Sequence, residues 1–164
     1  MTSLSFSDTE FRNVLGHLPT GVVVITGNAD GTPVGMSCNS FTSVSLAPPL
    51  VGFFPGMSSS TWPSIRDTGK FCVNILAAHH DEVSKLFSRR GIDRFSEVDW
   101  SWRQSGPALA DAVAWIDCEL YSETQAGDHT LALGRVIGIE AQEDIDPLVF
   151  HKGKYGMLAK QPAE

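Results

Sequence analysis

Apolar residues recur at helical spacing near the start of the chain and in short strand-like runs after it. Ser7-Asp8-Thr9-Glu10 has the S-x-x-E form of a helix capping box, and apolar residues follow it at helical spacing: Phe11, Val14, Leu15 and Leu18. Pro19-Thr20-Gly21 ends this predicted helix. A β-branched run over residues 22–26 predicts a strand, and Asn28-Ala29-Asp30-Gly31 predicts the turn that follows it.

Strands with short helices between them are expected along the rest of the chain. The predicted strands cover residues 33–36, 50–54, 71–76, 113–121, 131–139 and 148–151. Short helices are expected over residues 61–68 and 80–87, and the polar residues 88–106 indicate a loop. There is no regular βαβ alternation, and no G-x-G-x-x-G turn follows the first strand, so a Rossmann site is not expected. The pattern favours a mainly β fold, a mostly antiparallel barrel with a few short helices.

Length and charge narrow the classes of protein to consider. The 164 residues fit one domain, 1–164, and the net charge of −7 gives no general affinity for nucleic acid or anionic lipid. No apolar run approaches the roughly 18 residues that a membrane span needs. The first eight residues lack the basic and apolar regions of a signal peptide. A cytoplasmic protein is therefore expected, with no nucleic-acid or membrane partner.

Cysteine and histidine positions give little indication of a metal site. Cys38, Cys72 and Cys118 are odd in number and show no C-x-x-C spacing, which favours buried, reduced thiols. His79 and His80 are adjacent, and two adjacent histidines cannot easily face one metal ion. No bound metal is expected.

Three polar segments are candidates for binding chemistry, and each has a plainer explanation. In Gly35-Met36-Ser37-Cys38-Asn39-Ser40-Phe41-Thr42-Ser43-Val44-Ser45, small polar side chains follow a strand and would let backbone N–H groups approach a ligand, although such residues also occur in ordinary turns. Met57-Ser58-Ser59-Ser60-Thr61 precedes a predicted helix and would suit a phosphate, or Ser60 or Thr61 would simply cap that helix. Gly127-Asp128-His129-Thr130 is a turn in which Asp128 would orient His129, or His129 is a surface residue. Together these segments indicate a phosphate-bearing cofactor without naming it.

Five segments, in order, resemble the flavin reductase-like family with the FMN-binding split β-barrel. They are PTGVVVIT from Pro19, GMSCNSFTSVSLAPPLV from Gly35, SSSTWPSIRDTGKFCVNIL from Ser58, GDHTLALGRV from Gly127 and PLVFHKGKYG from Pro147. The resemblance implies a split antiparallel barrel paired as a homodimer, with the flavin near the subunit interface. It also implies an NAD(P)H:flavin oxidoreductase that passes a hydride from NADH or NADPH to FMN or FAD. Such reductases supply reduced flavin to a partner monooxygenase that hydroxylates aromatic or steroid rings.

The resemblance also assigns residues to the two ligands. The flavin ring and ribityl chain would lie against Met36, Ser37, Cys38, Asn39, Ser40 and Ser43. The flavin phosphate would lie against Ser59, Ser60 and Thr61, with Asn74, Arg94 and Phe95 near the same cofactor. The nicotinamide would lie against Gly127, Asp128, His129 and Tyr155. His129 is the expected catalytic residue, which would bind and orient the nicotinamide rather than act as a base. The phosphate's cationic partner stays open among Arg89, Arg90 and Arg94.

Two alternatives remain open from the sequence. A flavoprotein of this fold would retain its flavin and reduce another acceptor, or a non-catalytic module would only bind or store flavin. Oxidation of NADH in the presence of free flavin distinguishes both from a flavin reductase.

Overall fold

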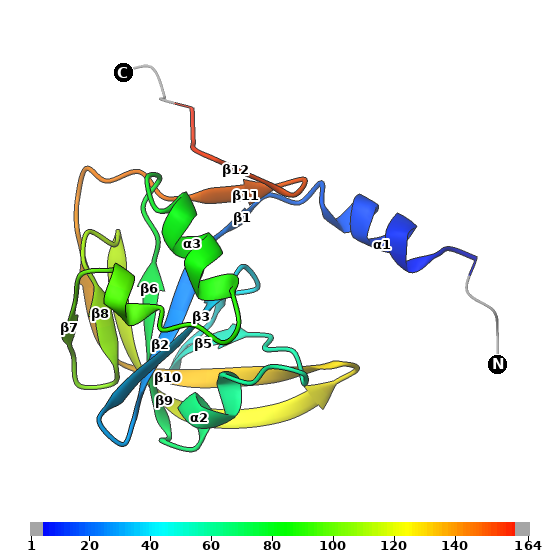
Figure 1. Ribbon diagram of the computed structural model, residues 1–164. Helices are drawn as coiled ribbons and strands as arrows, with labels where there is room; N and C mark the ends of the chain where they lie inside the picture. Colours follow the sequence, from blue (N-terminus) through cyan, green and yellow to red (C-terminus); the bar gives the residue numbers. More distant parts are fainter. Residues whose placement is uncertain (1–4, 160–164) are drawn as a thin grey trace.

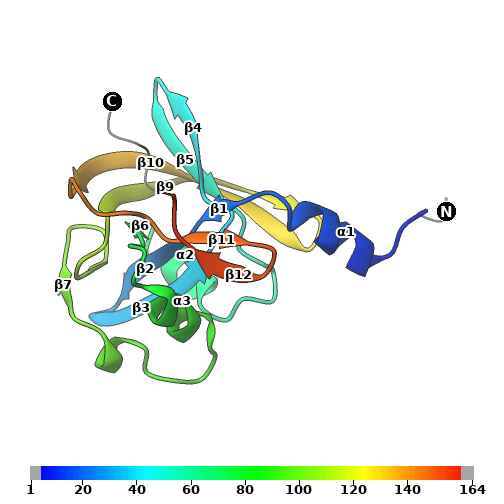
Figure 2. The same cartoon turned by 90° about the horizontal axis from the view of Figure 1, so that it is seen from above.

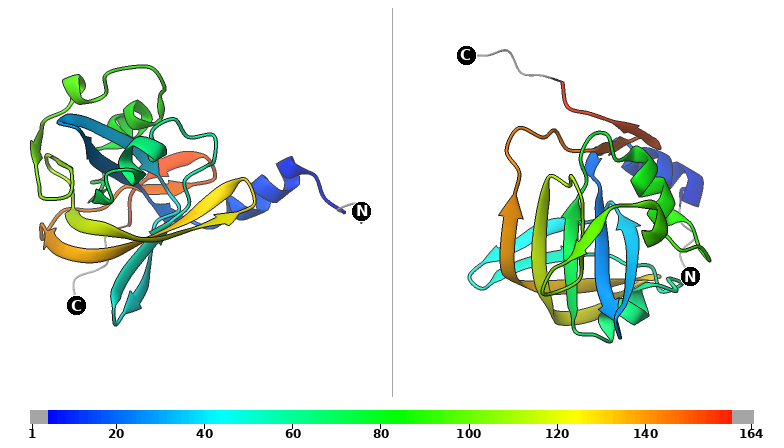
Figure 3. Two further views of the ribbon diagram at one scale, coloured as in Figure 1. Left: turned by 90° about the horizontal axis from the view of Figure 1, so that it is seen from below. Right: turned by 60° about the vertical axis from the view of Figure 1, so that its left-hand side comes forward.

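Seven antiparallel strands form the main sheet of the computed structural model, which describes residues 5–159 (Figure 1). Residues 1–4 and 160–164 lie outside the described residues. The prediction about a signal peptide falls partly on the first of these two segments. In spatial order the strands are β3 (Thr32–Cys38), β2 (Val23–Ala29), β6 (Lys70–Ile75), β9 (Ala114–Ala126), β10 (His129–Ala141), β5 (Pro49–Phe53) and β4 (Thr42–Leu46). The sheet curls around an apolar core, and the β4–β5 hairpin extends away from the body (Figures 2 and 3). The mainly β, antiparallel prediction is confirmed.

Two small sheets and four helical segments complete the described fold. One sheet has the order β1 (Thr20–Gly21), β11 (Val149–His151) and β12 (Lys154–Gly156), and the other pairs β7 (Trp100–Trp102) with β8 (Pro107–Leu109). The helical segments are α1 (Asp8–Leu15), α2 (Trp62–Arg66), α3 (Asp81–Ser88) and the 3₁₀ turn η1 (Phe95–Glu97). No helix in residues 5–159 is long and apolar enough to cross a membrane.

Helix α1 begins as the sequence predicts, but among the described residues its apolar side is covered only in part, by Phe6, which stacks on Phe11. Ser7 accepts a hydrogen bond from the Glu10 backbone, and the Glu10 carboxylate accepts one from the Ser7 N–H, so the capping box is complete. The helix ends at Leu15, and none of its residues is buried. It projects from the barrel body (Figures 1 and 2), and its apolar side chains are left exposed: Phe11, Val14 and Leu15.

Strand β2 is buried on both faces and separates two apolar cores. Val23 and Ile25 point into the core inside the curled sheet, while Val22 and Val24 point into a second core beneath α3. Side chains alternate between the two faces of a strand, so a continuous apolar run is what this position requires. The hairpin to β3 turns through Asp30 and Gly31, both at positive φ, and pairs Val24 with Ser37.

The same alternation along β3 decides which side chains face α3. Val34, Met36 and Cys38 pack against the inner core. Gly35 and Ser37 therefore face α3, where a Cβ on Gly35 would come within 2.8 Å of the Phe87 ring. Glycine at this position allows α3 to lie close against β3, beside the half-buried Ser37.

Several sequence predictions need correction. Residues 88–106 are not a plain loop, because they contain η1 and β7, and Arg103 donates to the buried Asp117 carboxylate at 2.8 Å. Strands β9 and β10 are longer than predicted and meet at a turn of Gly127 and Asp128. Strands β1, β4, β8 and β12 were not predicted.

Candidate functional site

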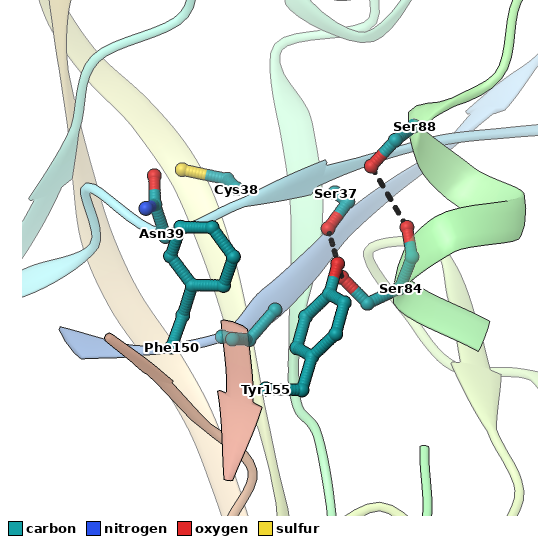
Figure 4. A pocket seen from close by; sticks show the side chains of 8 residues that line it. Ser37, Cys38, Asn39, Ser84, Ser88, Phe150 and Tyr155 are labelled. Carbon is teal, nitrogen blue, oxygen red and sulfur yellow. Dashed lines mark hydrogen bonds between the residues drawn. The ribbon is translucent and has the colours of Figure 1, made fainter. Parts of the chain in front are cut away.

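Three adjoining cavities lie between β3, α3, the segment before α2 and the C-terminal hairpin. The first, here called the Tyr155 cavity (Figure 4), has a volume of about 260 Å³ and is lined by Val22, Ser37, Cys38, Asn39, Ser84, Ser88, Phe150 and Tyr155. The second, the serine cavity, has about 250 Å³ and is lined by Met36, Ser37, Gly56, Ser58, Ser59, Ser60, Thr61, Phe87, Ser88, Arg90 and Arg94. The third, the Arg94 cavity, adjoins the serine cavity through Ser60, Thr61 and Arg94. Ser37 and Ser88 line both the first and the second cavity, so the two form one cleft.

The residues after β3 divide between the cleft and the scaffold. Met36, Ser37, Cys38 and Asn39 line the cleft. The Ser40 hydroxyl instead accepts from the Phe54 N–H at 2.9 Å and contacts the Cys38 sulfur at 3.1 Å, which fixes the end of β3 against the end of β5. Burial raises the pKa of the Cys38 thiol, so it stays neutral. Ser43 lies exposed on β4 and lines none of the three cavities.

The serines before α2 carry out two different tasks. The Ser59 hydroxyl accepts from the backbone N–H groups of Trp62 at 3.1 Å and Thr61 at 3.3 Å. Ser59 therefore satisfies the start of the helix, and neither Ser60 nor Thr61 does so through its side chain, contrary to the capping alternative. The hydroxyls of Ser60 and Thr61 are left at the wall of the serine cavity.

Two arginines line the serine cavity, but they differ in how much of their hydrogen bonding is already used. Arg94 donates to the Gly35 carbonyl at 2.8 Å, to the Arg89 carbonyl and to the Thr61 hydroxyl at 3.3 Å. Burial lowers the pKa of Arg94. The N–H groups of its guanidinium already donate to protein acceptors. Arg90 is exposed and makes one long bond, 3.5 Å, to the Ser58 carbonyl. Arg90 is thus the guanidinium with donors available to an anion in this cavity.

The turn between β9 and β10 reaches the edge of the serine cavity. The Met57 N–H donates to the Asp128 carbonyl at 3.0 Å, the Thr130 N–H donates to the Pro55 carbonyl at 2.9 Å, and Gly56 forms a β-bridge with His129. Gly127 has φ +64°, which favours glycine in this turn. The turn therefore holds His129 beside Gly56, a residue that lines the cavity.

His129 has one ring nitrogen engaged and one free. Its Nδ1 lies 2.7 Å from the Asp128 carboxylate, which can only accept when ionised. That bond, followed by the charge attraction of His129, lowers the pKa of Asp128. The network therefore assigns a hydrogen of the His129 ring to Nδ1, and Nε2 is the nitrogen that faces the cavity. A Cβ on Gly56 would lie 3.8 Å from this Nε2, so the free nitrogen lies at the cavity edge.

Tyr155 is held at the other end of the cleft by α3. Its hydroxyl lies 2.9 Å from the Ser84 Oγ, which in turn lies 2.9 Å from the Ser37 Oγ (Figure 4). Its ring packs against Phe150, with centroids 5.3 Å apart. Sequence reasoning missed Ser84, Ser88 and Phe150. Serines four residues apart, among the apolar positions of an amphipathic helix, were the available signal for the first two.

The structure does not bring Asn74 to the cleft. Asn74 is fully buried, and its amide donates to the Val24 carbonyl at 3.1 Å, to the Thr26 hydroxyl at 3.2 Å and to the Pro107 carbonyl at 3.3 Å. Its side-chain oxygen accepts from the Leu109 N–H at 2.7 Å. These bonds fix β8 against β2 and β6, which explains a buried amide without a ligand. Phe95 is mainly a core residue stacked edge-on against Phe87, with an edge at the Arg94 cavity.

Comparisons with known proteins identify the family of the chain. Residues 15–159 match the model of the flavin reductase like domain. The chain is 44% identical over 151 residues to a flavin reductase of Pseudomonas putida, covering 91% of this chain and 89% of that one. It is 43% identical over 146 residues to HsaB, the reductase subunit of a flavin-dependent monooxygenase of Rhodococcus jostii, covering 88% and 75%.

A solved structure supports the same assignment. The NADH:FAD oxidoreductase SgcE6 of Streptomyces globisporus, in complex with NAD and FAD fragments, superimposes with a TM-score of 0.90 at 33% identity, covering 96% of this chain and 98% of that one. The chain therefore belongs to the flavin reductase-like family and is an NAD(P)H-dependent flavin reductase.

Proposed function

We propose that the cleft made by the serine cavity and the Tyr155 cavity is where this reductase binds flavin and the nicotinamide. The observation that carries the proposal is the position of Ser37, which lines both cavities and so joins an anion-binding end to an aromatic end. Together the two volumes reach the ~300–1,000 Å³ typical of small-molecule sites.

The serine cavity suits the phosphate end of a flavin. Ser60 and Thr61 present hydroxyls, and Arg90 presents a guanidinium that is not fully engaged with the protein. Charged hydrogen bonds of this kind are strong enough to select a phosphate-bearing ligand. Arg94 would contribute indirectly, because it donates to the Thr61 hydroxyl and to the Gly35 carbonyl and so fixes the cavity wall.

The β3 segment suits the flavin ring. Met36, Ser37, Cys38 and Asn39 offer backbone groups and small side chains along one wall. Backbone N–H groups aimed at the N1–C2=O edge would stabilise negative charge there without reorganising. Bound flavin supplies the hydride acceptor, and NADH or NADPH supplies the hydride.

The turn of Gly127, Asp128 and His129 suits the nicotinamide. With its Nδ1–H given to Asp128, the His129 ring presents Nε2 to the carboxamide of the nicotinamide. Hydride transfer needs no base, so we assign His129 to holding the ring in place, with the reacting atoms ~3–3.5 Å apart. Tyr155 lies at the other end of the cleft, so a nicotinamide held by both residues would extend along the cleft from His129 to the C-terminal hairpin.

The oligomeric state and the partner enzyme are also part of the proposal. We infer a homodimer, because the apolar side of α1 and the hairpin residues Val44 and Leu46 are exposed in a single chain. The partner enzyme would be a flavin-dependent monooxygenase, as it is for the Rhodococcus jostii relative. FMN or FAD would leave for it after reduction. A single domain over 1–164 and a cytoplasmic location complete the proposal.

The test crosses NADH and NADPH with FMN and FAD under anaerobic conditions, and follows nicotinamide oxidation at 340 nm. Turnover of free flavin in large excess over protein is expected. Oxidation that requires a different acceptor while flavin stays bound would favour the retained-flavin alternative. Bound flavin that no nicotinamide reduces would favour a storage module.

A further inference from the structure

Three hydroxyl groups form a continuous chain through the wall of the cleft. Ser37 on β3, Ser84 on α3 and Tyr155 on β12 are linked by two O···O contacts of 2.9 Å each (Figure 4). Ser84 in the middle is 1% exposed, whereas Ser37 and Tyr155 are half-buried and line the cleft. The row of three hydroxyls therefore has a buried centre at Ser84 and two ends, Ser37 and Tyr155, that a ligand can reach.

Counting hydrogens shows that the two ends are not independent. Three hydroxyls carry three hydrogens, and the two contacts use two of them. If Ser37 and Tyr155 both donated to Ser84, the Ser84 hydrogen would be buried without an acceptor among the residues described, which is costly. In the two remaining arrangements Ser84 relays the direction of donation. Either Ser37 or Tyr155 then keeps a hydrogen for a ligand, but not both.

We propose that Ser84 is a positioning residue that sets the Ser37 hydroxyl as a donor to the flavin. Tyr155 donates to Ser84, Ser84 donates to Ser37, and Ser37 is left with its hydrogen directed into the cleft. In this state the Tyr155 oxygen accepts from the second ligand. The inference rests on the proposed placement of the flavin beside Ser37.

Removal of each member has a different consequence. In Ser84→Ala, Ser37 loses the neighbour that fixes its rotamer, and its hydroxyl turns freely. In Tyr155→Phe, Ser37 is the one acceptor left for the buried Ser84 hydrogen within residues 5–159, so Ser37 keeps its own hydrogen for the flavin. A purely structural link between α3 and its neighbours would instead be weakened by both changes.

The experiment titrates flavin into each purified variant and measures steady-state reduction. We expect Ser84→Ala to weaken flavin binding about 3- to 10-fold, with a matching rise in the flavin KM and a kcat near wild type. Ser84→Thr, which keeps the hydroxyl, should restore binding. Tyr155→Phe should bind flavin as tightly as wild type or more tightly.

Ser105→Ala is the matched control for folding. Ser105 is also buried and hydrogen-bonded, to Asp117, and it lines none of the three cavities. It should lower thermal stability and leave flavin affinity unchanged.

Two outcomes overturn the inference while the proposed cleft stands: wild-type flavin binding by Ser84→Ala, or equal weakening by Tyr155→Phe and Ser84→Ala. If Ser84→Ala does not fold, weaker flavin binding by Tyr155→Phe than by wild type overturns the inference on its own. Wild-type kinetics and flavin binding in Ser37→Ala would instead remove the flavin from this wall, and the proposed cleft would fail with the inference.

Discussion

The guanidinium of Arg94 donates to the carbonyl oxygen of Gly35 at 2.8 Å, and so ties the segment after α3 to the strand that forms the cleft wall. Arg90, four residues earlier, has no comparable attachment. The two arginines line the same cavity but differ in what their loss should do.

Arg90→Ala should weaken FMN binding about 10- to 100-fold and leave thermal stability near wild type, because it removes a charged partner of a phosphate. Riboflavin, which has no phosphate, should bind almost unchanged. Arg94→Ala should lower the melting temperature, since it frees the Gly35 and Arg89 carbonyls. Flavin fluorescence titrations and thermal melts on both variants make the comparison. Equal loss of FMN and riboflavin in Arg90→Ala would contradict the phosphate assignment.

Ser60→Ala combined with Thr61→Ala should likewise weaken FMN far more than riboflavin. Ser59→Ala removes the hydroxyl that satisfies the start of α2, and should lower the free energy of unfolding by about 1 kcal/mol. Denaturant unfolding and flavin titration on both proteins separate the roles. If both proteins lose similar stability, and the double variant binds FMN and riboflavin equally weakly, the segment serves only to cap the helix.

His129→Ala should raise the KM for NADH about 3- to 10-fold, because one polar contact to the carboxamide of the nicotinamide is lost. Flavin affinity should change little. Stopped-flow flavin reduction is compared with a flavin titration on the same variant. A variant that binds flavin poorly but reduces it normally once saturated would place His129 on the flavin side.

Asp128 should titrate at higher pH when its partner is removed. In the wild type the bond to His129 lowers the pKa of Asp128, so this pairing favours the folded state above the unfolded pKa of ~3.9 and is lost as pH falls through the lower folded value. A ¹³C titration of the carboxyl group should show a higher midpoint in His129→Ala than in wild type. An unchanged midpoint would mean that the pair does not form in solution.

Polar substitution of the exposed side of α1 should produce monomers. Phe11→Ser with Val14→Ser removes apolar area that a single chain leaves uncovered. Light scattering at micromolar concentration is the measurement, and Thr9→Asp on the opposite side of the helix is the control. A wild-type protein that is already monomeric and fully active would contradict the dimer.

Some elements could be predicted because local chemistry alone specifies them. The capping box of Ser7 and Glu10 places the start of α1 without help from the rest of the chain. The β-branched run over residues 22–25 reads as a strand because it is buried on both faces. By contrast, β4 carries small polar residues on an exposed hairpin, and β12 is three residues long, so neither has a clear apolar pattern.

The site was predicted where its residues are adjacent in sequence and missed where the fold assembles it. Met36, Ser37, Cys38 and Asn39 come from one strand and its end, whereas Ser84 reaches Ser37 only because α3 packs on β3. The structural role of Asn74 was equally hidden, since its partners Val24 and Leu109 lie far away in the sequence. No spacing rule reports such contacts.

The two-residue turn of Asp30 and Gly31 lies at the far end of the β2–β3 hairpin from the cleft, yet it sets the register in which Ser37 is paired with Val24. A slip of one residue would exchange the two faces of β3, directing Ser37 into the apolar interior and Met36 or Cys38 toward α3. Insertion or deletion of a single residue at this distant turn should therefore abolish flavin binding, although every residue of the cleft would still be present.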